Sequence, residues 1–391
     1  MYLFATSIFF LIFRFKFIIL NNMRRTFKFR IYPNEKQKIY LFITLDICRW
    51  IYNKTIELRK KAWQDEKERM SFFSTGYYIT DWRRERPYIS TVHSQCLRDA
   101  QLRVDRAFKA FFRRVKAKEK PGYPRFKSYE RYDSFTYTKS GFKIIGDRLK
   151  LSKIGSVKIR KHREIDGIVK TLTIRRTNNK WYACFSCEVQ PNILPEVDSI
   201  VGIDVGLTSF ATFSDGEKIV NPRFFRNDEV ELVKAQRRLS KQEKGTIARK
   251  KAKKIVSRIH EKIANRRSDF AHKLSRKLIN QYQVICFEKL DIKNMINNHT
   301  NVYGNKLNKS IGDVAWNQFI QYTTYKAEEA GRTVILVNPR NTSKMCSQCG
   351  KMVEKELSDR VHSCSCGLVL DRDHNASLNI LALGMQSLGK T

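Results

Sequence analysis

Residues 342–380 read TSKMCSQCG, then a polar run, then CSCGLVLDRDHNASLNI. This segment contains two closely spaced cysteine pairs, Cys346 with Cys349 and Cys364 with Cys366. Four thiolates that meet at one point give the tetrahedral sulfur coordination of structural Zn²⁺, with Zn–S distances of about 2.3 Å. The segment therefore predicts a structural zinc ribbon.

Two disulfides or four unrelated thiols are the alternatives to this metal site. Paired spacings rarely arise by chance, and Gly350 and Gly367 follow the two pairs where such turns need a positive φ angle. Cys184 and Cys187 also have the C-x2-C spacing, but they lie in an alternating strand pattern without a second pair nearby, so we interpret them as strand residues. The chain has nine cysteines, and this odd number in a long chain favours a reducing, cytoplasmic compartment. The other cysteines outside the ribbon are interpreted as small buried apolar residues: Cys48, Cys96 and Cys286.

The chain is strongly basic, with 76 Lys and Arg against 38 Asp and Glu and a formal net charge of +38 over 391 residues. Such an excess repels itself unless a polyanion binds, so we expect a nucleic-acid partner and a nucleoid-associated protein. A membrane surface is the alternative partner. Residues 1–20 are apolar, but Arg14 and Lys16 interrupt them and no cleavage site follows. We expect residues 1–22 to be an upstream extension from a misplaced start codon, with Met23 as the working start.

The first part of the chain after Met23 predicts a β-barrel with a helical insertion. Residues 23–34 give its first strand, which Pro33 stops, and Asn34 can cap the helix that follows. Residues 35–120 have helical periodicity and basic faces. Residues 121–195 return to short alternating runs, which suit the remaining strands of a small barrel. The apolar positions expected to face the core from the first helix are Ile39, Phe42, Ile43, Ile47, Trp50 and Ile51.

The strands of residues 196–340 predict an α/β domain. The first strand is an almost continuous apolar run with Asp204 inside it, and a carboxylate in the middle of a strand is costly unless it holds a cation or a partner. A later buried strand delivers Glu288 at its carboxyl end, where open α/β sheets place their sites. A helix over 311–330 and a strand over 333–337 follow. This order is the ribonuclease-H-like pattern: a three-stranded hairpin, helices, a strand, a helix, a strand and a helix.

Between these strands lies a long basic helical region that Gly245 divides. A solvated helix face normally carries both signs of charge, but acidic residues are few here, so we expect contacts with a nucleic-acid backbone. The apolar seam of its second part is expected to be Ile255, Ile259, Ile263, Phe270, Leu274 and Leu278. The basic residues expected to bind nucleic acid are Lys250, Lys251, Lys254, Arg258, Arg266 and Arg267.

Asp204, Glu288 and Asp373 lie on three separate predicted elements, the third at the start of the last helix. Two-metal phosphodiester hydrolysis needs carboxylates from several elements, because ions about 3.5–4 Å apart share them and flank the attacking water and the leaving oxygen. Mg²⁺ fits because it prefers octahedral oxygen coordination and keeps its waters. Asp371 is the alternate third acid, although it could instead cap the helix or contact the ribbon. Simple helix capping is the alternative explanation for both aspartates.

Several segments together resemble TnpB, a family of transposon-encoded RNA-guided endonucleases related to type V CRISPR effectors. The segments are MRRTFKFRIYPNEKQ, PGYPRFKS, VGIDVGLTSFAT, FEKLDI, SIGDVAWNQF, TSKMCSQCG and CSCGLVLDRDHNASLNI. They occur in the family's order from Met23 to about Leu383, and residues 1–22 fall outside the match.

The resemblance implies a multidomain protein of α/β and β-barrel class. Its wedge-like β-barrel is interrupted by a helical recognition region, and a RuvC-like domain follows with residues 341–370 as an inserted zinc ribbon and residues 371–391 as its last segment and tail. It also implies a guide RNA, a target DNA and, we expect, a monomer. The family's catalytic acids correspond to Asp204, Glu288 and the Asp371–Asp373 segment, and its zinc ligands to the four ribbon cysteines. The alternatives are a nuclease-inactive RNA-guided repressor and a ribonuclease-H-fold transposase that works without RNA.

Overall fold

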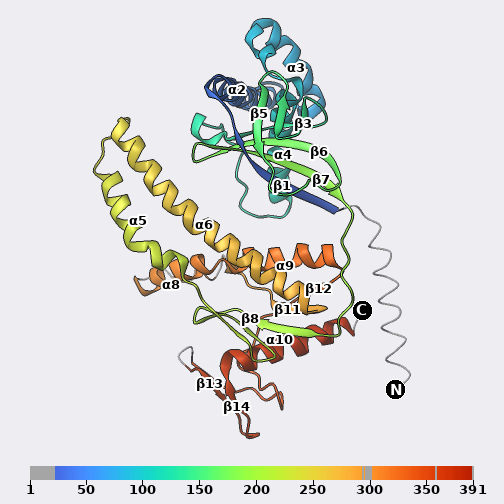
Figure 1. Cartoon of the computed structure of the whole chain (residues 1–391), viewed down its shortest axis with the longest axis vertical. Coiled ribbons are helices and arrows are strands. Elements are labelled where there is room, and N and C mark those ends of the chain that lie inside the picture. Colours follow the sequence, from blue (N-terminus) through green and yellow to red (C-terminus); the bar gives the residue numbers. More distant parts are fainter. Residues whose placement is uncertain (1–22, 293–294, 296–301, 357–358, 390–391) are drawn as a thin grey trace. The chain divides into compact units, whose positions relative to one another are not determined.

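The computed structural model of the chain contains two compact units, Asn21–Gln190 and Pro191–Thr391 (Figure 1). It describes residues 23–292, 295, 302–356 and 359–389, except for the side chains of 302–307. The expected extension at residues 1–22 lies outside the described residues and stays a prediction. Each unit has its own hydrophobic core.

The N-terminal unit contains a seven-stranded antiparallel sheet in the order β2-β6-β7-β1-β5-β4-β3. Tyr137 of β2 and Phe142 of β3 are in ring contact, with centroids 6.2 Å apart, so the sheet curls until its two edges nearly meet. The strands are β1 (Met23–Tyr32), β2 (Ser134–Tyr137), β3 (Phe142–Ile145), β4 (Arg148–Leu151), β5 (Gly155–Arg160), β6 (Ile168–Thr177) and β7 (Lys180–Val189). The short alternating runs of the sequence are confirmed as strands.

The β6–β7 turn explains why two adjacent asparagines interrupt the alternation. Asn178 and Asn179 have φ angles of +49° and +63°, as a two-residue type I′ hairpin turn requires. Along β1, Phe27, Phe29 and Ile31 are buried while the residues between them face outward. Arg24, Lys28 and Arg30 therefore lie on the outer face of the sheet, whereas Arg25 lies on the same side as Phe27.

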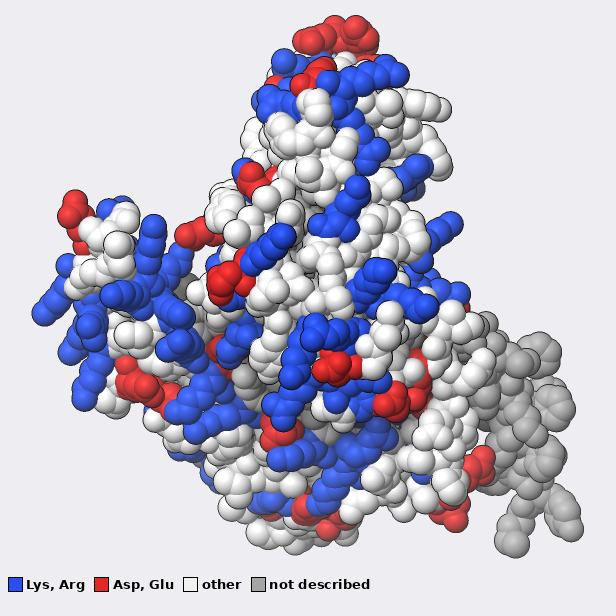
Figure 2. Space-filling view, turned by 45° about the horizontal axis from the view of Figure 1, so that its top comes forward, with Lys and Arg blue, Asp and Glu red and all other residues white. Residues whose placement is uncertain are grey.

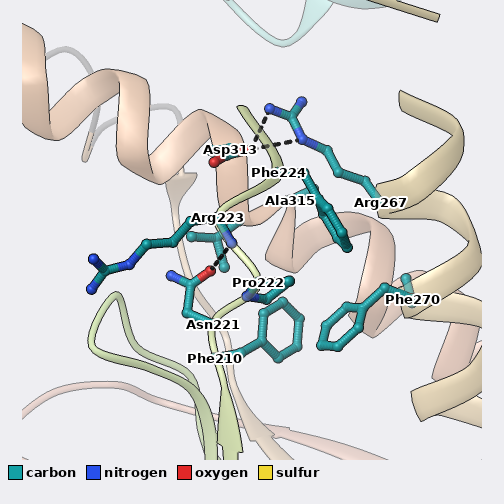
Figure 3. A pocket seen from close by; sticks show the side chains of 11 residues that line it. Phe210, Asn221, Pro222, Arg223, Phe224, Arg267, Phe270, Asp313 and Ala315 are labelled. Atoms are coloured by element: carbon teal, nitrogen blue, oxygen red, sulfur yellow. Dashed lines mark hydrogen bonds and ion pairs between the residues drawn. The ribbon is translucent and has the colours of Figure 1, made fainter. Parts of the chain in front are cut away.

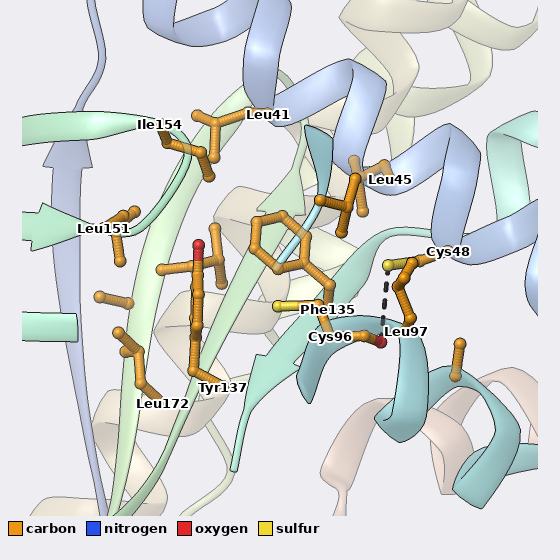
Figure 4. Packing of buried hydrophobic residues seen from close by; sticks show 14 of the residues in the cluster. Leu41, Leu45, Cys48, Cys96, Leu97, Phe135, Tyr137, Leu151, Ile154 and Leu172 are labelled. Carbon is orange, nitrogen blue, oxygen red and sulfur yellow. Dashed lines mark hydrogen bonds between the residues drawn. The ribbon is translucent and has the colours of Figure 1, made fainter. Parts of the chain in front are cut away.

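Helices α2 and α4 cover the inner face of this sheet (Figure 4). Leu41 and Leu45 of α2 pack with Phe135 and Tyr137 of β2 in the cluster that Figure 4 shows. The helices of this unit are α2 (Glu35–Glu66), α3 (Phe72–Glu85) and α4 (Ser94–Lys116), with short 3-10 turns η1 (Pro87–Thr91) and η2 (Tyr129–Arg131). The predicted cap is confirmed, because the Asn34 side chain accepts a hydrogen bond from the Gln37 backbone N–H at 2.8 Å.

The predicted core face of α2 is partly wrong. Ile39 and Ile43 are 59% and 39% exposed, whereas Leu41, Leu45 and Cys48 are buried. Apolar residues occur on more than one side of this helix, so the periodicity alone could not select the stripe that contacts the sheet.

The C-terminal unit contains a five-stranded mixed sheet in the order β10-β9-β8-β11-β12. The first three strands are antiparallel neighbours, and β8, β11 and β12 run parallel. The strands are β8 (Ile200–Asp204), β9 (Ser209–Phe213), β10 (Lys218–Val220), β11 (Val284–Glu288) and β12 (Thr333–Val337). The element order predicted from the sequence is thus found in the structure.

The helices of this unit are α5 (Phe224–Ser240), α6 (Ile247–Gln281), α8 (Val302–Val314), α9 (Trp316–Ala330) and α10 (Arg372–Leu388). Gly245, with φ at +93°, lies between α5 and α6 as predicted. The predicted seam of α6 is buried or half-buried except for Ile255, which is 38% exposed; its neighbour Val256 packs in the cluster with Leu232 of α5 instead. Within the described part of the chain, no helix is both long and apolar enough to cross a bilayer.

The single helix predicted over 311–330 is wrong, because Ala315 has a φ of +55° and separates α8 from α9. The break is associated with a buried carboxylate (Figure 3). Asp313 accepts hydrogen bonds from the Phe225 backbone N–H at 2.9 Å and from the Arg267 guanidinium at 2.6 Å. A carboxylate at the N-terminus of α5 also complements the helix dipole. These contacts compensate for the strained alanine and hold α8 against α5 and α6.

Candidate active site and metal centre

The four ribbon cysteines converge in the structure. The sulfur atoms of Cys346, Cys349, Cys364 and Cys366 all lie within 4.8 Å of one another. Sulfur–sulfur distances of 3.7 Å for Cys346–Cys366 and 3.5 Å for Cys349–Cys364 are far longer than the roughly 2 Å of a disulfide bond. The disulfide alternative is therefore excluded, and the cluster fits a tetrahedral zinc site.

Each cysteine pair lies on a tight turn that a glycine completes. Gly350 and Gly367 have φ angles of +75° and +92°, which confirms their predicted role. Their backbone N–H groups donate to the carbonyls of Cys346 and Cys364 at 2.9 and 3.0 Å. The second turn lies between the two strands of a short antiparallel pair, β13 (Val361–Ser363) and β14 (Val369–Asp371).

Two of the thiols are favoured as thiolates by the backbone of their own turns. The N–H of Cys349 lowers the pKa of Cys346 to about 7, and the N–H of Cys366 lowers the pKa of Cys364 to about 6. Since the thiolate is the form that binds zinc, these turns favour the binding form of Cys346 and Cys364 near neutral pH.

Cys349→Ser is expected to lower bound zinc and to loosen the ribbon, because the substitution removes one of the four thiolates that a structural zinc site of this type needs. Zinc content by elemental analysis and protease resistance of the C-terminal unit measure this effect. Cys184→Ser is the matched control. Cys184 shares the C-x2-C spacing with Cys187, but the two side chains point to opposite faces of β7. A Cys349→Ser protein with full zinc content and unchanged protease resistance would show that the thiols are not ligands.

Two of the predicted acids lie at the carboxyl ends of neighbouring parallel strands. Ile203 of β8 pairs with Phe287 of β11, so Asp204 and Glu288 are the next residues along the two strands. Asp204 is the last residue of β8, which corrects its predicted position in the middle of the strand. The apolar residues that follow it continue as a loop before β9, and the sequence pattern did not distinguish that loop from strand.

The two aspartates at the start of α10 have different partners. Asp371 is the N-cap and accepts hydrogen bonds from the backbone N–H groups of Asp373 and His374, at 3.0 and 3.1 Å. Its other oxygen pairs with Lys218 of β10 at 2.8 Å. Burial alone would raise the pKa of Asp371, but these hydrogen bonds together outweigh it and hold the pKa below its usual range. Asp371 is thus occupied as a helix cap. Asp373, in the first turn, pairs with Arg372 at 3.5 Å and raises the pKa of Asp204 more than Asp371 does.

Electrostatic repulsion links the three predicted catalytic acids. Burial, then the charges of Glu288 and Asp373, raises the pKa of Asp204 well above its usual value. Burial also raises the pKa of Glu288, against a hydrogen bond from the Thr342 hydroxyl. In contrast to the four sulfurs, the oxygens of these acids do not all lie within 4.8 Å of one another. Carboxylates that hold two ions about 3.5–4 Å apart need not all contact the same ion.

The predicted basic residues of α6 divide into two groups. Lys250, Lys251, Lys254 and Arg258 are exposed on the outer half of the helix, and Lys and Arg crowd the projecting α5–α6 hairpin in Figure 2. Arg266 and Arg267 instead pair with acids of the same unit, Asp228 at 2.9 Å and Asp313 at 2.6 Å. Nucleic-acid binding by all six residues stays a prediction.

Sequence reasoning missed Thr342, which donates to Glu288, and Lys218, which pairs with Asp371. It also did not single out Asn375 and Asn379, two fully buried amides on α10 that hydrogen-bond to the ribbon. The only available signal was the pair of asparagines at helical spacing in DRDHNASLN.

The C-terminal unit is an α/β domain with acids at the carboxyl ends of two parallel strands and a four-cysteine centre. In a strongly basic chain, these features define a protein that acts on nucleic acid. Three family models match: "Probable transposase" over residues 184–299, "Cas12f1-like, TNB domain" over 316–380 and "Helix-turn-helix domain" over 23–68. In the structure, residues 23–68 contain strand β1 and the single long helix α2 instead of two short helices.

Relatives cover nearly the whole chain. A "Putative RNA-guided DNA endonuclease" of Streptomyces pristinaespiralis is 36% identical over 94% of this chain and 91% of that protein. A "Putative RNA-guided DNA endonuclease InsQ" of Escherichia coli K12 is 28% identical over 92% of each. The solved structure titled "Cryo-EM structure of the Cas12f1-sgRNA-target DNA complex" has a TM-score of 0.59 at 14% identity, over 92% of this chain and 98% of that one. The chain belongs to the TnpB-like family of RNA-guided DNA endonucleases.

Proposed function

We propose that the chain is the RNA-guided DNA endonuclease of a transposon and that it cuts DNA at Asp204, Glu288 and Asp373. The observation that carries this proposal is the meeting of three buried or half-buried acids from β8, β11 and α10, elements far apart in the sequence. Arg372 offsets only part of their mutual repulsion, since the pKa of Asp204 stays well above its usual value. Acids held in this way are typical of functional sites.

In this proposal the C-terminal unit is a RuvC-like nuclease domain made of residues 196–340 and 371–391, with residues 341–370 as its zinc ribbon. The antiparallel β10-β9-β8 part followed by parallel β11 and β12 supports the ribonuclease-H-like assignment. Residues 23–34 and 121–195 form the wedge barrel, and residues 35–120 form the recognition insertion. The nearly closed sheet and the helices α2 to α4 support this division.

Asp204, Glu288 and Asp373 would hold Mg²⁺, since their oxygens are the ligands that this ion prefers. When bound, the ions would activate water for attack on the phosphodiester and stabilise the leaving oxygen. Asp371 has a different task here. By capping α10 and pairing with Lys218, it fixes the helix start from which Asp373 projects.

The partners in this proposal are a guide RNA and a target DNA. Base pairing with the guide would select the sequence, which leaves the protein to hold nucleic-acid backbones through Lys and Arg. The formal charge of +38 and the exposed basic residues of α6 support such contacts. We further propose that the protein acts as a monomer in the cytoplasm, at the nucleoid.

Protein purified from its host is expected to carry a discrete RNA, and the loaded protein is expected to cut matching DNA in Mg²⁺ but not in EDTA. Sequencing of the copurified RNA and a cleavage assay with matched and unmatched DNA measure this. Cutting without any discrete RNA would favour the RNA-independent transposase. Guided binding without cutting in Mg²⁺ would favour the nuclease-inactive repressor.

A further inference from the structure

A continuous set of buried hydrogen bonds joins the first cysteine turn of the ribbon to α10. Asn375 is fully buried, and its side-chain oxygen accepts from the Ser347 backbone N–H at 2.9 Å while its amide donates to the Met345 carbonyl at 2.8 Å. Met345 and Ser347 are the neighbours of the ligand Cys346 on either side. The Asn375 side chain of α10 therefore holds the backbone on both sides of this cysteine.

The same hydrogen bonds continue from the ribbon to Glu288. Asn379, one helical turn after Asn375 and 2% exposed, donates to the Met345 carbonyl at 2.7 Å and to the Thr342 carbonyl at 2.8 Å. Thr342 is 4% exposed, and its hydroxyl donates to the Glu288 carboxylate. The cysteine turn, two asparagines, one threonine and one acid thus form a single buried network.

We propose that Thr342 is a positioning residue for Glu288 and that the zinc ribbon acts through it to hold this carboxylate ready for a divalent cation. This inference rests on the proposed function of Glu288. It gives the ribbon a second role besides stabilising the fold, because the backbone on which Thr342 lies is fixed by the same asparagine that fixes the cysteine turn.

The need for such a positioning residue follows from the charges around Glu288. A glutamate has several rotatable bonds, and Asp204 on the adjacent strand repels its carboxylate. A donated hydrogen bond favours one rotamer of Glu288, and buried networks of this kind fix geometry only when every member has its partner. Outer partners of metal ligands typically change metal affinity by about 10–100-fold when they are removed.

Thr342→Val, which keeps the shape but removes the hydroxyl, is expected to weaken Mn²⁺ binding about tenfold or more and to lower DNA cleavage in parallel. Mn²⁺ binding to the full-length protein is measured by electron paramagnetic resonance, independently of activity. Zinc content is expected to stay at the wild-type value. Thr342→Ser restores the hydroxyl and is expected to restore Mn²⁺ binding. Ser387→Ala at the exposed end of α10 is a control expected to change neither quantity.

Glu288→Gln separates this inference from the proposed function. If Glu288→Gln loses Mn²⁺ binding and cleavage while Thr342→Val keeps both, the positioning role is wrong and the proposed site stands. If Glu288→Gln itself keeps Mn²⁺ binding and cleavage, the proposed site is wrong. Should Thr342→Val fail to fold, Asn379→Asp takes its place, since it keeps the volume but cannot donate to Thr342; unchanged Mn²⁺ affinity there overturns the inference.

The link to the ribbon is tested by combining Thr342→Val with Cys366→Ser in a double-mutant cycle. Loss of zinc is expected to weaken Mn²⁺ binding in the wild-type background and to have little further effect once Thr342 is valine, because both changes interrupt one network. If the two effects on Mn²⁺ affinity simply add, or if Cys366→Ser leaves Mn²⁺ binding unchanged, the ribbon does not act through Thr342.

Discussion

Asp204→Asn is expected to abolish DNA cleavage by the RNA-loaded protein, with a loss of about a thousandfold or more, or ~4 kcal/mol in the activation barrier. Asparagine keeps the shape of the side chain but has no charge to hold a cation between β8, β11 and α10. Binding of the guide and of matching DNA should stay at wild-type affinity, because we propose that Lys and Arg make these contacts. Cleavage rates and filter-binding affinities measured on the same protein preparations separate the two effects.

The same variant is expected to unfold at a higher temperature than the wild type when divalent ions are chelated. The pKa of Asp204 is raised in the folded protein by its burial and by Glu288 and Asp373. A carboxyl with a raised folded pKa stabilises the protein while it is protonated, and this contribution is lost as the pH rises through the folded pKa. The stability difference between Asp204→Asn and the wild type should therefore grow from acidic to alkaline pH.

Asp198→Asn is the matched control, since Asp198 is exposed just before β8 and lies outside the acidic cluster. It should cleave DNA as the wild type does. Persistent cleavage by pure Asp204→Asn would refute the assignment of Asp204, and a melting temperature below that of the wild type at alkaline pH would contradict the proposed repulsion.

Much of the fold could be predicted because its signals are local. The alternation along β6 and β7 is readable within one hairpin, and the turn at Asn178 and Asn179 fixes its register. The ribbon is also local, because its ligands lie in two short turns whose glycines adopt the expected φ angles. Glu288 and Asp373 could be placed because the sequence marks the elements that carry them. A run of apolar residues predicts the strand that ends at Glu288, and the acidic capping residues predict the start of the helix that contains Asp373.

The parts that could not be predicted depend on contacts between distant segments. Ala315 has no local reason to leave the helical conformation; the break suits Asp313, whose partners Phe225 and Arg267 lie far away in the sequence. The same holds for Thr342, because its hydroxyl matters only once β11 brings Glu288 beside it. A side-chain hydrogen bond between distant segments does not appear in the hydrophobic periodicity of the sequence.

Gly202→Ala is expected to lower DNA cleavage about hundredfold, because a shift of about 1 Å at a reacting group can cost that much. A Cβ atom on Gly202 of β8 would lie 2.2 Å from the Ser377 carbonyl oxygen and 2.6 Å from the Leu381 backbone nitrogen. Both are backbone atoms of α10, so the helix itself must move away from the strand. That movement carries Asp373, in the first turn of α10, away from Asp204 on the same strand as the glycine.

Overpacking at this contact is also expected to destabilise the C-terminal unit by about 1–3 kcal/mol, measured by chemical unfolding. Gly312→Ala on α8 is the matched control, since no atom lies within 4 Å of the position its Cβ would take. The control should keep wild-type cleavage and stability. If Gly202→Ala cleaved DNA as fast as the wild type, the close contact between β8 and α10 would not determine how the carboxylates meet. The activity would then tolerate a looser arrangement of the three acids than we propose.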